Sequence, residues 1–237
     1  MEKLMEEKKT TLWQEIKICR VDETNYPHDL KKIKDRPEVL YYRGNIDILN
    51  EHKSIAVVGS RKISAVGAKL AYNGFNLVNG LALGCDAEAL KGALAAGGKC
   101  AVVLPCGINE IYPKSNQWIA EEVLKQGGCL ISEYPEGTRP EKYRFVQRDR
   151  LQSGMSQGVL VVEAMEKSGT MHTAEYAKKQ NRRLACYYHG LLKYSTGNNV
   201  LENLYQAAVI KTNEDLENYL CEIADIEEYT QLSFDFV

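Results

Sequence analysis

Hydroxyl, glycine and guanidinium groups follow two of the most apolar segments of this chain. The apolar runs 54–58 and 158–164 each lead into a short polar loop, and the second loop opens a segment with helical spacing at 173–177. Glycine lets an anion approach the backbone, hydroxyl and guanidinium groups bind its oxygens, and the first amides of a helix lack partners within the helix. We therefore predict two phosphate-binding loops, although Ser168 and Thr170 would serve equally as helix caps. The predicted loop residues are Gly59, Ser60, Arg61, Ser168, Gly169 and Thr170.

Cationic and aromatic side chains alternate between positions 142 and 150. Single-stranded nucleic acids are bound by cations that follow the phosphates and by aromatic faces on which bases stack. The residues of these types are Lys142, Tyr143, Arg144, Phe145, Arg148 and Arg150. A solvated cationic loop with two aromatic residues in the core would have the same composition.

The hydrophobic pattern predicts strands that alternate with helices. Strands that are apolar on both alternations need cover on both faces. We therefore expect an α/β fold with a doubly wound, mainly parallel sheet and helices on both faces. The two phosphate loops would lie side by side if both preceding strands occupy the centre of the sheet. The expected strands are 38–44 at a sheet edge, then 54–59, 75–79, 100–105, 128–132, 158–163, 183–188 and 207–211.

The chain is expected to divide into three parts. Residues 1–37 would form an N-terminal helical extension that begins with a charged helix over 1–19, residues 38–213 the Rossmann-like domain, and residues 214–237 an acidic C-terminal tail. After Lys211 the chain has eight acidic residues and no Lys or Arg, so the remainder is net positive and suited to a polyanion. The tail would either compete with that polyanion or only add solubility.

Composition excludes several other classes of protein. The 237 residues are 44% hydrophobic, which suits one globular domain. No apolar run approaches the roughly 20 residues of a membrane span, and the charged start is no secretory signal, so we expect a cytoplasmic protein. The seven cysteines form no Cys-x-x-Cys pair and the four histidines are scattered. We therefore expect reduced cysteines, no metal site and no cofactor.

Short motifs between residues 26 and 210 occur together in one order. Through them the sequence resembles the DNA processing protein A family (DprA, also called Smf). The motifs are Tyr26-Pro27, Asp35-Arg36-Pro37, Leu40-Tyr41-Tyr42-Arg43-Gly44, Val58-Gly59-Ser60-Arg61, Asn79-Gly80-Leu81-Ala82-Leu83-Gly84-Cys85-Asp86, Leu104-Pro105-Cys106-Gly107-Ile108, Tyr112-Pro113, Ser132-Glu133-Tyr134-Pro135, Phe145, Arg148-Asp149-Arg150, Val161-Val162-Glu163-Ala164, Ser168-Gly169-Thr170, Thr173-Ala174 and Ser195-Thr196-Gly197-Asn198.

The resemblance implies an extended Rossmann fold that binds single-stranded DNA, forms a homodimer and helps to load the recombinase RecA, without catalysis. Such a protein acts in recombination by positioning the strand, and it would serve DNA uptake by natural transformation, repair or phage defence. Matching by motif assigns Arg61, Lys142 and Phe145 to the DNA pocket. The helical and winged-helix modules often appended in the family are expected to be absent, which leaves the Rossmann-like core.

Four positions depart from the family pattern. Leu83 stands where Arg is usual, Cys85 where Ile is usual, Leu90 where His is usual and Asp149 where Asn is usual. Each lost phosphate contact would reduce the salt dependence of single-strand binding by a slope of about 0.7. We expect Asp149 to pair with neighbouring arginines instead. The short spacing between Gly67 and Asn79 further predicts a truncated first crossover helix.

A related group of enzymes provides the alternative function. The loop at 168–170 also resembles that of phosphoribohydrolases of the "lonely guy" type, which cleave nucleotides, and Glu163 and Glu175 flank it. Two carboxylates beside a phosphate loop would suit an oxocarbenium-like centre. A nucleotide-binding sensor that uses the same loops is a third reading.

The last residues resemble a docking peptide. Gln231-Leu232-Ser233-Phe234-Asp235-Phe236 resembles the short peptides with which bacterial proteins bind the replication sliding clamp. The other interpretation is a frayed or packed terminus.

Overall fold

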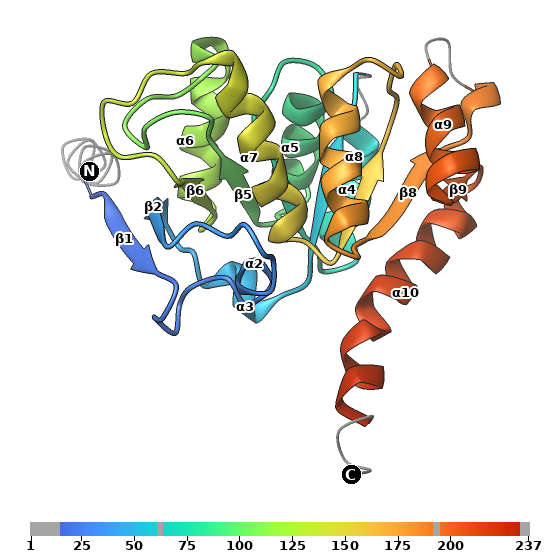
Figure 1. Ribbon diagram of the computed structural model, residues 1–237, viewed down its shortest axis with the longest axis horizontal. Coiled ribbons are helices and arrows are strands. Elements are labelled where there is room, and N and C mark those ends of the chain that lie inside the picture. The colour runs from blue at the N-terminus through green and yellow to red at the C-terminus, as the bar shows by residue number, and fades with distance from the viewer. Residues whose placement is uncertain (1–14, 61–63, 192–194, 233–237) are drawn as a thin grey trace.

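A single mixed sheet crosses the whole molecule (Figure 1). The computed structural model describes residues 15–60, 64–191 and 195–232. Within these ranges the sheet has nine strands in the order β1-β2-β6-β5-β4-β3-β7-β8-β9, and only the pairs β1–β2 and β2–β6 are antiparallel. The strands are β1 (Lys17–Arg20), β2 (Val39–Gly44), β3 (Ser54–Val58), β4 (Asn76–Asn79), β5 (Cys100–Val103), β6 (Cys129–Ser132), β7 (Gly158–Val161), β8 (Arg183–Tyr187) and β9 (Ala208–Ile210).

Helices cover both faces of the sheet, as the apolar strands require. Along β3, Ile55 and Val57 belong to the core on one face, whereas Ala56 and Val58 belong to the core on the other. The first face is covered by α4 (Ser64–Tyr72), α5 (Cys85–Ala95), α6 (Gln117–Lys125) and α10 (Asn213–Leu232). The second face is covered by α2 (His28–Lys31), α3 (Ile48–Glu51), α7 (Lys142–Gly154), α8 (Gly169–Lys179) and α9 (Thr196–Tyr205). The expected doubly wound α/β fold is thus confirmed.

The direction of winding reverses between β3 and β7. From β3 the chain proceeds through β4 and β5 to β6 on one side, then returns to place β7 directly beside β3 and continues to β8 and β9 on the other. Such a reversal opens a crevice at the carboxyl ends of the two strands, where open α/β sheets bind their ligands. The two predicted phosphate loops follow these two strands, so their expected juxtaposition is confirmed.

The sequence prediction was wrong at the N-terminal side of the sheet. Residues 54–211 hold every expected strand to within about two residues, but Lys17–Arg20 form strand β1 instead of ending a helix. Cys19 is buried opposite Leu40 in this pairing, while its neighbours are exposed. Consequently β2 is an internal strand and not the expected edge. Residues 1–14 lie outside the described ranges.

The acidic C-terminal segment begins as a packed helix and not as a free tail. Leu216, Tyr219, Leu220 and Ile223 are buried against the sheet, at the spacing of one helix face. The Tyr219 hydroxyl lies 2.9 Å from the carbonyl oxygen of Arg183. Farther along, α10 extends away from the body of the molecule (Figure 1). Of the expected clamp-binding peptide, Gln231 and Leu232 end α10 and the remaining residues lie outside the described ranges.

The structure also allows a check for membrane-spanning elements. No helix within the described ranges combines the length and the hydropathy needed to cross a bilayer.

Candidate functional site

The loops after β3 and β7 are joined by hydrogen bonds. The backbone amide of Ser60 donates to the carbonyl oxygen of Glu163 at 2.8 Å, and the Ser60 hydroxyl donates to the same oxygen at 3.0 Å. A side chain at Gly59 would lie 3.0 Å from the backbone nitrogen of Glu163, so a residue without a Cβ is needed for this close approach. The Ser60 hydroxyl thus fixes the loops together.

A cavity of about 240 Å³ opens where these two loops meet α5 and α7. Its wall combines the start of α8, the end of β3 and one face of α7, which are brought together by the reversal in the sheet. The lining residues are Val58, Gly59, Ala82, Asp86, Phe145, Arg148, Asp149, Gln152, Gly169, Thr170 and Thr173.

The predicted site residues fall into three groups. Gly59, Phe145, Arg148, Gly169 and Thr170 line the cavity. Outside its lining are Ser60, Lys142, Arg150 and Ser168, and Arg61 lies outside the described residues.

The N-terminus of α8 faces the cavity without a side-chain cap. The Ser168 hydroxyl donates to the carbonyl oxygen of Met165 at 2.7 Å, and no described side chain bonds to the first amides of the helix. The capping role weighed for Ser168 is therefore not the one observed. Gly169 is exposed, and a Cβ there would meet no atom within 4 Å, so an anion has access to this helix end.

Arg148 forms the cationic floor of the cavity. Its side chain is 5% exposed, and its guanidinium lies over Gly80, where an added Cβ would be only 1.2 Å from Nη1. Within the described part of the chain, Nε and Nη1 have no hydrogen-bond partner, and Nε approaches Asp149 Oδ1 at 3.6 Å. Buried guanidinium groups are normally hydrogen-bonded, so Arg148 has donors that a ligand oxygen could accept from if the side chain turned toward the cavity.

Two carboxylates flank this cation. The Oδ2 atom of Asp86 accepts from the backbone amides of Gly80 at 2.9 Å and Ala82 at 3.3 Å. The Oδ1 atom of Asp149 accepts from Gln152 Nε2 at 2.9 Å. Burial raises the pKa of Asp149 to about 7, because it outweighs the opposing effect of Arg148. The expected pairing of Asp149 with a neighbouring arginine is confirmed.

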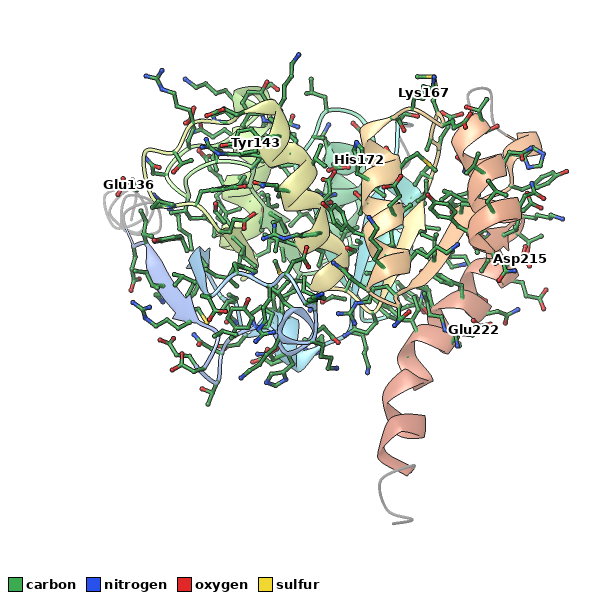
Figure 2. All side chains as sticks on the ribbon, in the orientation of Figure 1. Glu136, Tyr143, Lys167, His172, Asp215 and Glu222 are labelled. Carbon is green, nitrogen blue, oxygen red and sulfur yellow. The ribbon has the colours of Figure 1, made fainter. Side chains whose placement is uncertain are left out.

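The aromatic part of the site lies on the first turn of α7. Phe145 is half-buried and packs edge-to-face on Tyr112, with ring centroids 5.4 Å apart. Lys142 is exposed one helical turn before Phe145, on the same side of the helix. Figure 2 shows Tyr143 on this end of α7 and Lys167 on the loop before α8, at the same edge of the molecule. Of these aromatic and cationic groups, Phe145 lines the cavity itself.

The other two arginines of α7 have structural contacts. Arg150 donates from Nη1 and Nη2 to the Glu133 carboxylate at 2.8 and 2.6 Å. Arg144 hydrogen-bonds to the Arg139 carbonyl and lies over the rings of Tyr134 and Tyr143. The basic segment is thus a helix whose charges have different tasks, in contrast to the solvated loop that was the alternative.

Several site residues were not singled out from the sequence. Gly80 and Asp86 were quoted only as part of a motif, and nothing in their spacing to Arg148, which is more than sixty positions away, indicates that they meet. The departures have separate explanations: Leu83 is exposed on the loop after β4, whereas Cys85 and Leu90 are buried in the core. Leu90 therefore serves packing.

The carboxylates expected for nucleotide cleavage are not part of the cavity lining. Glu163 is buried and Glu175 is half-buried on α8, and neither is among the described residues that line the cavity. The carboxylates that do line it are Asp86 and Asp149. In the described ranges no group of three or more His, Cys, Asp or Glu side chains is placed to hold a metal ion.

Comparison with known proteins identifies the family. The chain is 38% identical to Protein Smf of Synechocystis sp. over 172 residues, which are 68% of this chain and 43% of the relative. It is 35% identical to DNA processing protein DprA of Bacillus subtilis over 179 residues, 72% of this chain and 60% of the relative. The chain thus spans about half the length of these curated relatives.

The fold agrees with a solved structure of the same family. DNA processing protein A from Helicobacter pylori, whose structure was described for its single-stranded DNA binding mode, superposes with a TM-score of 0.77 at 29% identity. The superposition covers 88% of this chain and 96% of that one. Residues 17–220 match the family described as DNA recombination-mediator protein A, and the chain belongs to this family.

Proposed function

We propose that the protein binds single-stranded DNA and acts in DNA recombination by positioning the strand, without catalysis. The observation that carries the proposal is Arg148, a buried guanidinium with two unpartnered nitrogens among the described residues, on the floor of a cavity at the sheet reversal. The Helicobacter pylori relative, which binds single-stranded DNA, supports the choice of ligand.

Each part of the proposed interface has a physical task. A phosphate oxygen would bind Arg148, with Gly169 and Thr170 at the helix N-terminus as further donors. Phe145 would stack on a base, and Lys142 would attract the neighbouring phosphate. Arg61 and Ser60, on the adjacent loop, and Ser168 would complete the path of the backbone. Arg150 would hold α7 in place through Glu133.

The wider biological setting is also part of the proposal. We expect a cytoplasmic homodimer whose further partner is RecA, with a role in natural transformation or another recombination pathway. Clamp binding through Gln231–Phe236 is an additional expectation. A peptide of residues 225–237 that fails to retain the sliding clamp would eliminate that contact.

Fluorescence anisotropy of a labelled single-stranded oligonucleotide across a salt series tests the proposed function. Replacing Arg61 and Lys142 together by Ala should weaken binding at least tenfold at low salt. It should also reduce the slope of log affinity against log salt by about 0.7 for each lost phosphate contact. Arg20→Ala on β1, an exposed cation at the far edge of the sheet, is the matched control and should bind as the wild type does.

Two outcomes would contradict the proposal. One is a folded wild-type protein that does not bind at low salt, and the other is a double variant that binds as tightly as the control. Release of free base from nucleoside 5′-monophosphates would instead support the nucleotide-cleaving alternative, which the positions of Glu163 and Glu175 disfavour.

A further inference from the structure

The cavity floor carries charges of both signs in direct competition. Arg148, Asp86 from α5 and Asp149 from its own helix all line the cavity, and the charge of Arg148 acts on both carboxylates. If both acids are ionised, these three groups sum to a net negative charge. The single positive charge of Arg148 balances one of the two carboxylates, and the other would repel a phosphate that enters the site.

The two acids differ in how firmly their surroundings hold the ionised form. Asp86 accepts two backbone amide hydrogen bonds, from Gly80 and Ala82, and such donors favour a carboxylate. Among the described residues, Asp149 accepts one hydrogen bond, from Gln152, and its ion pair with Arg148 Nε spans 3.6 Å. Burial raises the pKa of Asp86 as well, so the assignment rests on geometry. The side-chain amide that donates to Asp149 can rotate, whereas the two backbone amides that donate to Asp86 cannot, and Asp149 is therefore the acid that can give up its charge.

The surroundings of Asp149 can accommodate a proton. The Gln152 side chain is buried, and its Oε1 atom has no hydrogen-bond partner among the described residues. Rotation of this amide would present Oε1 to a protonated Asp149, so either protonation state can be hydrogen-bonded. Burial raises the pKa of Asp149 to about 7, which places the change within the range of ordinary conditions.

We propose that binding of a DNA phosphate at Arg148 is coupled to uptake of one proton by Asp149. A proton from solvent neutralises the Asp149 carboxylate, Arg148 loses its competing partner, and its free N–H groups turn to the phosphate oxygen. The coupling rests on the proposed function, and it adds that this protein releases single-stranded DNA as the pH rises through neutrality.

Other titrating groups near Asp149 must be separated from it. The charged and titratable groups that act on Asp149 in the described ranges are Arg148 on α7, Asp86 on α5 and Tyr176 on α8. His172, also on α8 (Figure 2), is a further ionisable side chain. An Asp149→Asn variant retains all of these groups, so any pH dependence that they cause persists in the variant.

Anisotropy titrations between pH 6.0 and pH 8.5 at fixed ionic strength test the coupling. The oligonucleotide should carry no terminal phosphate, because a phosphomonoester titrates near pH 6. Wild-type affinity should fall by roughly tenfold or more over this range, the effect of one linked proton. Asp149→Asn should bind at pH 8.5 at least as tightly as the wild type does at pH 6.0. Glu217→Gln, which removes one exposed charge on α10, should behave as the wild type.

The outcomes distinguish this inference from the proposed function. Equal pH slopes for the wild type and Asp149→Asn would overturn the coupling while leaving DNA binding intact. If no variant binds DNA, the proposed function fails, and the coupling is then tested by NMR titration of the Asp149 carboxyl group with and without sulfate. A rise in the Asp149 pKa on adding sulfate would uphold proton-coupled anion binding at this site, and an unchanged value would overturn it.

Discussion

Gly80 determines how deeply the Arg148 guanidinium can lie in the cavity. A methyl group at position 80 would overlap Nη1, at 1.2 Å, and the same residue donates its amide to Asp86. The backbone angle φ of Gly80 is not in the left-handed region, so the need for glycine here is one of space. One residue without a side chain therefore places both the cation and its buried counter-charge.

Gly80→Ala should displace the Arg148 side chain and weaken single-strand binding at least tenfold, with a loss of about 1–3 kcal/mol in stability from overpacking. A double-mutant cycle with Arg148→Ala identifies the cause, because removing the guanidinium removes the clash. We expect Gly80→Ala to cost little stability in the Arg148→Ala background. Equal stability losses in both backgrounds, measured by chemical denaturation, would show that the space at Gly80 serves another contact.

At the scale of elements, the strands that are buried on both faces were predictable from the sequence. The partly exposed strand β1 and the packed face of α10 were not. Strands such as β3 and β7 are apolar on both faces, so their sequence alone defines them. Strand β1 is Lys-Ile-Cys-Arg, in which only Cys19 is buried, and its pairing with β2 decides its conformation. The start of α10 carries acidic residues between its buried apolar residues. Because of these charges the segment was predicted to be an acidic tail and not a packed helix.

The packing of α10 changes how its acidic charge should be tested. A deletion after Asn213 would remove Leu216, Tyr219, Leu220 and Ile223 from the core and should leave the protein unfolded, since one buried Leu→Ala change already costs about 2–5 kcal/mol. A deletion after Ala224 keeps these contacts and should melt within a few degrees of the full chain.

The shorter deletion tests competition between the acidic segment and DNA. It removes Asp225, Glu227, Glu228 and Asp235, so single-strand affinity should increase several-fold at low salt and the gain should vanish at high salt. Anisotropy titrations on both proteins measure the effect. Identical affinities at low salt would mean that the acidic segment does not reach the DNA site.

For the molecule as a whole, the reversal of winding between β3 and β7 explains why the site is where it is. The carboxyl ends of these strands lie side by side, so residues from loops about a hundred positions apart meet there. The sequence predicted that the two loops would lie side by side if both preceding strands occupied the centre of the sheet, and this condition is met. It did not predict that α7 and the loop after β4 close the cavity with Arg148, Gly80 and Asp86, because helix orientation over a sheet depends on the packing of whole faces.

The buried acid should also affect the stability of the entire fold. Asp149 has a pKa of about 7 in the folded protein and near 3.8 when unfolded, so the folded state binds the proton more tightly. The resulting stabilisation is complete below the unfolded pKa and is lost as the pH rises through the folded pKa. Asp149→Asn has no such proton, so its stability relative to the wild type should increase by on the order of 2 kcal/mol between pH 5 and pH 8.

Urea denaturation of both proteins at several pH values measures this difference. At pH 5 the difference in free energy of unfolding between the two proteins includes the effect of replacing an acid by an amide beside Arg148. The change of this difference with pH isolates the titration of Asp149. Glu217→Gln is again the control, because it removes one carboxylate on α10, which is paired with Lys69 and does not line the cavity. If Asp149→Asn and the wild type keep a constant difference from pH 5 to pH 8, Asp149 is ionised throughout. An ionised Asp149 would then balance the charge of Arg148 over this whole pH range.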